Sequence, residues 1–262
     1  MKKGICLGCV PGDTLDAKLK LAKDAGFDGV EINAAEDDQT ILNSKEAADG
    51  HGLEIPSIMG GLHWSHPLSS PDAQTRKLCS EGFKQSLRQA RSIGVNTVLL
   101  VPAVVTDDVP YEDAWQRSIQ EIRDLANVAE QEQVYLALEN VWNKFLLSPI
   151  EFNQYLDEIA SPFVNAYFDC GNIVAYGYPH HWIRSLGHRI QKIHVKGFTV
   201  FPNVGFPHSL EGDVPWAACR KAWQDIGYDD YLTVEIGPDP NDKTESMYRY
   251  SEQLDRIIEG RI

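Results

Sequence analysis

Four polar side chains in the second half of the chain lie inside or at the end of otherwise apolar runs. They are Glu139 in VYLALEN, Asp169 in NAYFDCGN, His194 in QKIHVKG and Glu235 in YLTVEIG. A buried carboxylate is costly unless it is paired or bound to a metal. One such residue is readily explained as a helix cap or ion-pair partner. Three carboxylates and one imidazole together form a ligand set that suits Mn²⁺, Mg²⁺, Zn²⁺ or Co²⁺, and we therefore predict one divalent metal site.

The elements that would position these residues alternate regularly along the chain. Short apolar runs predict eight strands, at residues 4–10, 29–33, 54–59, 97–101, 134–139, 166–169, 192–195 and 231–236. Amphipathic segments with helix start and stop signals predict helices at 14–25, 72–93, 111–131 and 215–226. Strands that alternate with helices predict a parallel sheet joined by crossover helices.

Eight such units without a composition break favour a closed (β/α)₈ TIM barrel over an open sheet. The 262 residues fit one barrel domain, residues 1–262. The segment CVPGDT after the first predicted strand lacks the G-x-G-x-x-G pattern of dinucleotide-binding folds. Because active sites of TIM barrels lie at the carboxyl ends of the strands, we expect Glu139, Asp169, His194 and Glu235 to meet there.

Composition narrows the class of protein. The net charge of −14 argues against a nucleic-acid partner, although a local pocket could still hold a sugar phosphate. No stretch approaches the roughly 20 apolar residues of a membrane span, and the amino terminus lacks a signal-peptide pattern, so we expect a cytoplasmic protein. The five cysteines do not form a disulfide framework, and Cys6 and Cys9 are expected on opposite faces of the first strand.

Five motifs carry a resemblance to a known family. In chain order, LALEN, YFDCGNIVAYGYPHHW, KIHVKG, EGDVPW and LTVEIG resemble the sugar phosphate isomerases/epimerases with a xylose-isomerase-like barrel. Within that family they are most similar to ketose 3-epimerases such as D-tagatose 3-epimerase and L-xylulose-5-phosphate 3-epimerase. The resemblance implies that Glu139, Asp169, His194 and Glu235 hold one divalent metal, most often Mn²⁺, and that the substrate is a sugar or sugar phosphate.

The chemistry expected from this resemblance is inversion of a carbon next to a carbonyl. A metal-bound cis-enediolate would hold the charge, and Glu139 and Glu235, on opposite sides of the barrel mouth, would act as acid and base. An aldose–ketose isomerase and an inosose-type dehydratase remain alternatives on the same metal site. A DNA-repair endonuclease is disfavoured by the negative charge, and a non-catalytic sugar-binding barrel by the intact ligand set. The oligomeric state stays open, a homo-oligomer included.

The residues that would contact the sugar differ from those usual in the family. Phe145, Asn172 and Val200 stand where free-ketose epimerases place Glu, His and Arg. We predict instead that substrate is bound by residues near the mouth, namely His63, Trp64, Asn140, Asn172 and Lys196. Glu31 in GVEIN could form hydrogen bonds within the mouth, and Asp213 is expected to cap a helix. His180, His181 and His208 are expected in loops outside the site.

Overall fold

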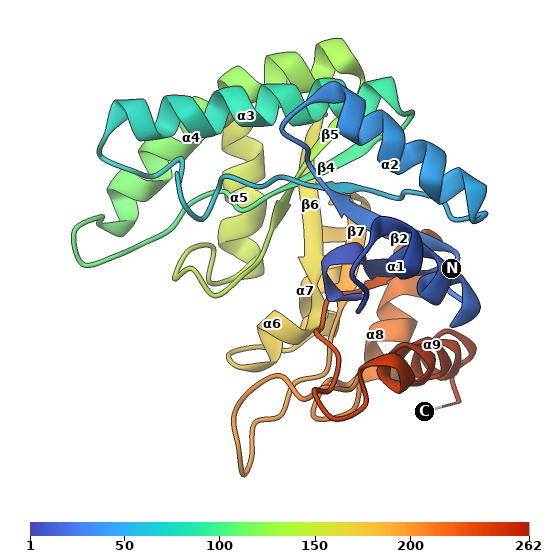
Figure 1. The fold of residues 1–262 in the computed structure, drawn as a ribbon. Coiled ribbons are helices and arrows are strands. Elements are labelled where there is room, and N and C mark those ends of the chain that lie inside the picture. The colour runs from blue at the N-terminus through green and yellow to red at the C-terminus, as the bar shows by residue number, and fades with distance from the viewer. Residues whose placement is uncertain (262) are drawn as a thin grey trace.

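The chain forms a closed barrel of eight parallel strands (Figure 1). The structure is a computed structural model and describes residues 1–261. Each strand pairs with the next along the chain, and the last pairs with the first. The strands are β1 (Lys2–Cys6), β2 (Gly29–Asn33), β3 (Ile58–Met59), β4 (Thr97–Leu100), β5 (Tyr135–Glu139), β6 (Val164–Asp169), β7 (Ile190–Val195) and β8 (Tyr231–Val234). The predicted (β/α)₈ barrel is therefore confirmed.

Helices surround the barrel and cover the outer faces of the strands (Figure 1). They are α1 (Leu15–Asp24), α2 (Asp38–Gly50), α3 (Ala73–Ser92), α4 (Tyr111–Glu132), α5 (Pro149–Ile159), α6 (Cys170–Val174), α7 (Pro179–Leu186), α8 (Trp216–Asp225) and α9 (Lys243–Glu259). Side chains of Thr14 and Asp72 accept hydrogen bonds from the first turns of α1 and α3, which fixes where these predicted helices begin. Among the described residues, no helix has the length and apolar character that crossing a membrane requires.

Only β2 has the predicted bounds, and the other seven strands differ from the prediction at one or both ends. The first strand ends at Cys6, where Cys6 pairs with Glu31, and the next residues form a 3₁₀ turn, Leu7–Cys9, closed by a hydrogen bond from Val10 N to Leu7 O. Cys9 therefore does not lie on the strand, and the expectation that it faces away from Cys6 across one strand was wrong. The third strand is only two residues long, and the eighth ends one residue before Glu235.

The barrel interior is filled by a small set of side chains that point inward. Leu99, Ala137 and Tyr167 are fully buried there and pack against Met59. At Gly4 a Cβ atom would come within 2.7 Å of Thr233 Oγ1, so a larger residue here would collide with the Thr233 side chain of β8. This packed interior leaves the strand ends as the place for polar chemistry.

Candidate metal centre

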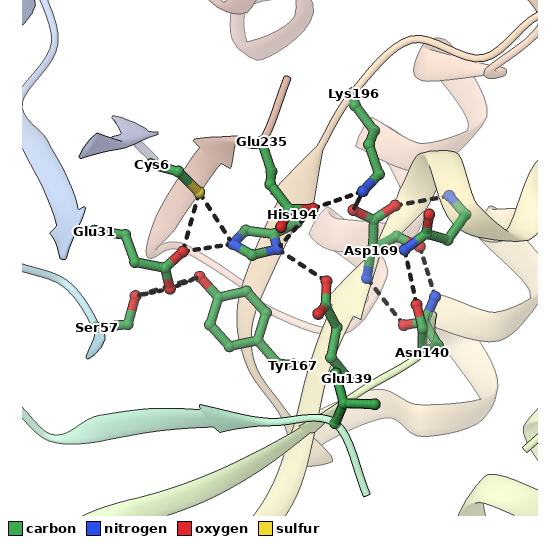
Figure 2. A network of polar contacts seen from close by, with 12 residues as sticks. Cys6, Glu31, Ser57, Glu139, Asn140, Tyr167, Asp169, His194, Lys196 and Glu235 are labelled. Atoms are coloured by element: carbon green, nitrogen blue, oxygen red, sulfur yellow. Dashed lines mark hydrogen bonds and ion pairs between the residues drawn. The ribbon is translucent and has the colours of Figure 1, made fainter. Parts of the chain in front are cut away.

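Strands β5 to β8 bring four polar side chains to one point at their carboxyl ends (Figure 2). Glu139 and Asp169 end β5 and β6, His194 lies in β7 directly opposite Asp169, and Glu235 follows β8. One ligand atom from each lies within 4.8 Å of all the others. Asp169 and His194 are fully buried, Glu139 is buried, and the Glu235 side chain keeps 26% of its exposure. The four residues predicted to meet do so.

The orientation of these groups fits a cation. His194 Nδ1 lies 2.9 Å from Glu139 Oε1 and 3.6 Å from Glu235 Oε2, so this nitrogen faces the carboxylates. Asp169 Oδ1 accepts a hydrogen bond from Asn172 N, whereas the buried Asp169 Oδ2 forms no hydrogen bond and has only the Lys196 ammonium near it, at 3.1 Å. Buried oxygens without partners are rare in proteins. A buried carboxylate oxygen that forms no hydrogen bond, beside two further carboxylates and an imidazole nitrogen, suits a divalent metal.

Lys196 lies at the edge of the centre. Its Nζ is 2.6 Å from Glu235 Oε2 and 3.1 Å from Asp169 Oδ2. Burial lowers the pKa of this ammonium, but the neighbouring carboxylates of Asp169 and Glu235 outweigh burial and raise it, so Lys196 is charged. A Cβ at Gly171 would lie 2.7 Å from Lys196 Cγ, so this glycine allows α6 to approach β7 at the lysine.

The two glutamates of the centre lie in different electrostatic surroundings. Burial, with the charge of Glu235, raises the pKa of Glu139 to about 7. Burial also raises the pKa of Glu235, but His194 and Lys196 reverse the direction and lower it. Paired carboxylates whose environments separate their pKa values are typical of acid–base pairs.

A second group of buried polar residues surrounds the other ring nitrogen of His194, Nε2. His194 Nε2 lies 2.7 Å from Glu31 Oε2, and both side chains are fully buried (Figure 2). Ser57 Oγ and Tyr167 OH donate to Glu31 Oε1 at 2.7 and 2.9 Å, and Cys6 Sγ donates to Glu31 Oε2 at 3.1 Å. With its Nε2 proton held by Glu31, the imidazole would present the Nδ1 lone pair to a metal.

The sequence had indicated Glu31 only as a strand-end acid in the mouth. The contact to His194 joins residues 163 positions apart, and no local pattern in GVEIN predicts it. The sequence marks Glu31 only as an acidic residue within an otherwise apolar strand. Ser57 and Tyr167 carried no such signal, because a serine or tyrosine in a strand is unremarkable.

Asn140 and Asn172 form a clamp that joins the ends of β5 and β6. The Asn140 side chain donates to Asp169 O at 2.8 Å and accepts from Asp169 N at 2.9 Å. Asn172 Nδ2 donates to Asn140 O at 3.0 Å. Their amide groups therefore bond the backbone around the Asp169 ligand.

The other predicted site residues have different surroundings. His63 is buried, stacks on Phe83, and has its pKa lowered to about 4 by burial, so this imidazole is neutral. Trp64 beside it is 55% exposed. Among the described residues, His180, His181 and His208 lie outside both groups of metal-ligating side chains, as expected, but His180 and His181 belong to helix α7 and not to a loop, which corrects that part of the prediction.

Phe145 and Val200, which differ from the family pattern, and Asp213, which was predicted to cap a helix, lie away from the metal centre. Phe145 is buried in an aromatic cluster with Tyr111, Trp115 and Tyr155, whereas Val200 is 48% exposed. Asp213 does not cap α8, whose N-cap is Pro215; its carboxylate instead accepts a hydrogen bond from Val200 N, because the β7–α8 loop folds back on itself.

Known proteins resemble this chain in sequence and in fold. SgbU of Escherichia coli (strain K12) is 31% identical over 194 residues, and the match covers 68% of this chain and just under two thirds, 66%, of SgbU. UlaE of Escherichia coli (strain K12 / DH10B), named an L-ribulose-5-phosphate 3-epimerase, is 29% identical over 84% of this chain and 81% of its own length.

Solved structures share the barrel at low sequence identity. The D-psicose 3-epimerase of Clostridium cellulolyticum H10, solved with D-tagatose, superposes with a TM-score of 0.74 at 21% identity, over 99% of this chain and 96% of that one. The IolI protein, solved with a bound zinc atom, superposes with a TM-score of 0.80 at 18% identity, over 100% and 99% of the two chains. Residues 19–257 match the family described as the xylose isomerase-like TIM barrel. This chain belongs to the xylose isomerase-like TIM barrel family.

Proposed function

We propose that this protein is a divalent-metal-dependent epimerase that inverts a carbon next to the carbonyl of a sugar or sugar phosphate, as ketose 3-epimerases do. The observation that carries the proposal is the convergence of Glu139, Asp169, His194 and Glu235 within 4.8 Å at the barrel mouth. Mn²⁺ is the first candidate because the resembled family most often holds it, and Mg²⁺, Zn²⁺ and Co²⁺ also suit the ligand set. The names of UlaE and of the D-psicose 3-epimerase support the reaction class, and the zinc atom of IolI supports a metal in this fold.

Glu139 and Glu235 exchange the proton in this proposal. They reach the centre from β5 and from the end of β8, which are separated by two strands in the ring, so one carboxylate can take a proton from one face of the substrate while the other returns a proton to the opposite face. A bound divalent metal would supply positive charge that stabilises the enediolate formed between the two transfers.

The neighbouring residues hold the centre and contact the substrate. Asn140 and Asn172 fix the backbone at Asp169, which orients the carboxylate that would ligate the metal. Lys196 donates to a substrate oxygen from its position between Asp169 and Glu235. His63 and Trp64 contribute to the sugar pocket after β3, with Trp64 as the exposed surface.

Substitution of the two glutamates tests the proton exchange. Glu139→Gln and Glu235→Gln each keep the shape of the side chain but remove the proton-accepting carboxylate, so turnover should fall by about 10²-fold or more. The metal content of each variant is measured by elemental analysis, so that lost chemistry is separated from lost metal.

The control variant is Glu54→Gln. Glu54 is a partly exposed carboxylate at the amino end of the barrel, paired with Lys2, and its loss should leave turnover unchanged. Near-normal turnover in both glutamine variants with metal still bound would refute the proposal.

A further inference from the structure

We propose that the substrate of this centre is an uncharged sugar, without a phosphate, whose apolar face packs on a surface formed by Trp142 and Phe206. This inference rests on the proposed function and names the substrate class for it. It depends on two independent features of the barrel mouth: an exposed aromatic surface beside the metal centre, and the charge of the loops around it.

The aromatic surface adjoins the metal centre through Lys196 and Asn172. Phe206 lies under the Lys196 ammonium, 5.1 Å from Nζ to the ring centroid, and the same Nζ contacts Asp169 and Glu235. The Trp142 ring lies 4.9 Å from that of Phe206, and its Nε1 donates to Asn172 O at 2.9 Å.

Both rings are held in place yet remain accessible. They pack against the fully buried Phe198 at 5.5 and 5.2 Å, while Trp142 and Phe206 stay 48% and 38% exposed. Exposed aromatic faces fixed from behind suit the C–H face of a sugar ring or of an extended ketose, which offers hydrogens to the π system and hydroxyls on its edges.

The loops around the mouth are strongly acidic. Within the described chain, the loop segments that follow the eight strands hold only two lysines, Lys144 and Lys196, and no arginine. These segments are residues 7–14, 34–37, 60–72, 101–110, 140–148, 175–178, 196–215 and 235–242. Lys196 is already shared by two carboxylates. The acids of the same segments are Asp13, Glu36, Asp37, Asp72, Asp107, Asp108, Glu211, Asp213, Glu235, Asp239 and Asp242. A phosphate dianion that approaches this face meets like charge, whereas a neutral sugar does not.

The usual anion positions of a barrel mouth are also filled by acidic side chains. Phosphate sites in TIM barrels are commonly built by the loops after the seventh and eighth strands. Here those loops carry Asp213, whose carboxylate accepts from Val200 N, and Asp242, which pairs with Arg249 at 2.8 Å. The first turns of α2, α3 and α6 donate to the carboxylates of Asp37, Asp72 and Asp169, which satisfies amides that a phosphate would otherwise bind.

The test compares matched substrates on the metal-loaded protein. L-Ribulose and L-ribulose 5-phosphate form one pair, and D-fructose and D-fructose 6-phosphate another, with turnover followed by NMR and binding by calorimetry. The neutral member of at least one pair should have the higher kcat/KM, by tenfold or more. Added salt should lower KM for the phosphate by screening repulsion and leave KM for the neutral sugar unchanged.

Three variants locate the binding surface. Trp142→Ala and Phe206→Ala should each raise KM or Kd for the neutral sugar about tenfold, and Trp142→Phe should restore most of the loss. Metal affinity is measured in each, because Trp142 contacts the backbone near Asp169. Tyr248→Ala, which removes a comparably exposed aromatic side chain from α9, is the matched control. It should change neither the affinity for the neutral sugar nor the affinity for the metal.

Turnover and binding give separate answers. If none of the sugars turns over, the proposed function fails, while tighter binding of a neutral sugar that depends on Trp142 would still support this inference. A phosphate preferred in kcat/KM or in Kd overturns it, as does the absence of binding by either class. Unchanged neutral-sugar affinity in both alanine variants also overturns it.

Discussion

The imidazole of His194 is held from two sides, and this arrangement explains how one nitrogen stays available to a metal. Glu139 faces Nδ1 and Glu31 faces Nε2, both within 3 Å. Glu31 is itself held by Ser57 and Tyr167. A carboxylate behind a ligating histidine fixes the ring and raises its basicity. Glu31 is therefore a positioning residue for the metal centre.

Glu31→Gln should weaken metal binding about 10–100-fold, because the amide can no longer hold the Nε2 proton with a full negative charge. Calorimetric titration of the metal-free protein with Mn²⁺ measures this directly, and the d–d spectrum of a Co²⁺-loaded sample should shift. The exposed carboxylate of Glu54 provides the control through Glu54→Gln. An unchanged Mn²⁺ affinity in Glu31→Gln would show that Glu31 supports only the fold.

The metal centre was largely predictable at the residue scale, but its surroundings were not. Glu139, Asp169, His194 and Glu235 stand out because a charged group in an apolar run needs a partner. Glu31, Trp142 and Phe206 depend on contacts between distant loops and strands, which a linear pattern does not contain. Asn140 and Asn172 were recognised by their place next to ligands, and their contacts turned out to be with the backbone.

The elements that carry the centre are anchored by their own packing. The loop between β5 and α5 turns Phe145 away from the mouth into a cluster with Tyr111, Trp115 and Tyr155, and Lys144 and Leu146 on either side have positive φ values of 59° and 53°. This cluster ties α4, α5 and the loop together. The position that the family pattern assigns to a sugar contact thus serves the core here.

Phe145→Ala should lower the free energy of unfolding by about 3–5 kcal/mol, because it leaves a cavity in a fully packed cluster. Denaturant unfolding followed by fluorescence and circular dichroism measures the loss. On the neighbouring helix, Ile150 is 76% exposed, and Ile150→Ala should change stability by only about 0.5 kcal/mol or less. Equal effects of the two substitutions would contradict the packing described for Phe145.

Element boundaries were predictable where a capping residue marks them. Thr14 and Asp72 begin α1 and α3 as capping chemistry requires. The first strand was predicted too long because the apolar residues continue through Leu7–Cys9, and composition alone does not distinguish a 3₁₀ turn from a strand. The third strand was also predicted too long, since Glu54 makes only an isolated bridge to Gly29 and the strand itself is Ile58–Met59.

At the scale of the whole molecule, strand–helix alternation was sufficient to predict the closed barrel. The barrel in turn explains why ligands from residues 139 to 235 meet at one end. Closing the ring also brings Glu31 of β2 across to His194 of β7, so the centre depends on both halves of the chain. Binding of a metal should accordingly stabilise the entire fold.

Saturating Mn²⁺, at about 100 times its Kd, should stabilise the folded protein by about 2.7 kcal/mol and raise Tm by roughly 5–10 °C. Chelation with EDTA should reverse the shift. Asp169→Asn removes a buried ligand oxygen and should abolish the response to Mn²⁺, whereas Glu54→Gln should retain it. An equal Mn²⁺ shift in Asp169→Asn would place the bound metal elsewhere.

The most direct test of the central claim is to follow the reacting carbon in D₂O. The metal-loaded protein is incubated with ketoses and ketose phosphates, and the products are examined by NMR. Proton exchange by Glu139 and Glu235 on opposite faces predicts deuterium at C3 together with inversion at C3. Deuterium confined to C1 or C2 with formation of an aldose would contradict epimerisation and indicate an aldose–ketose isomerase on the same four residues.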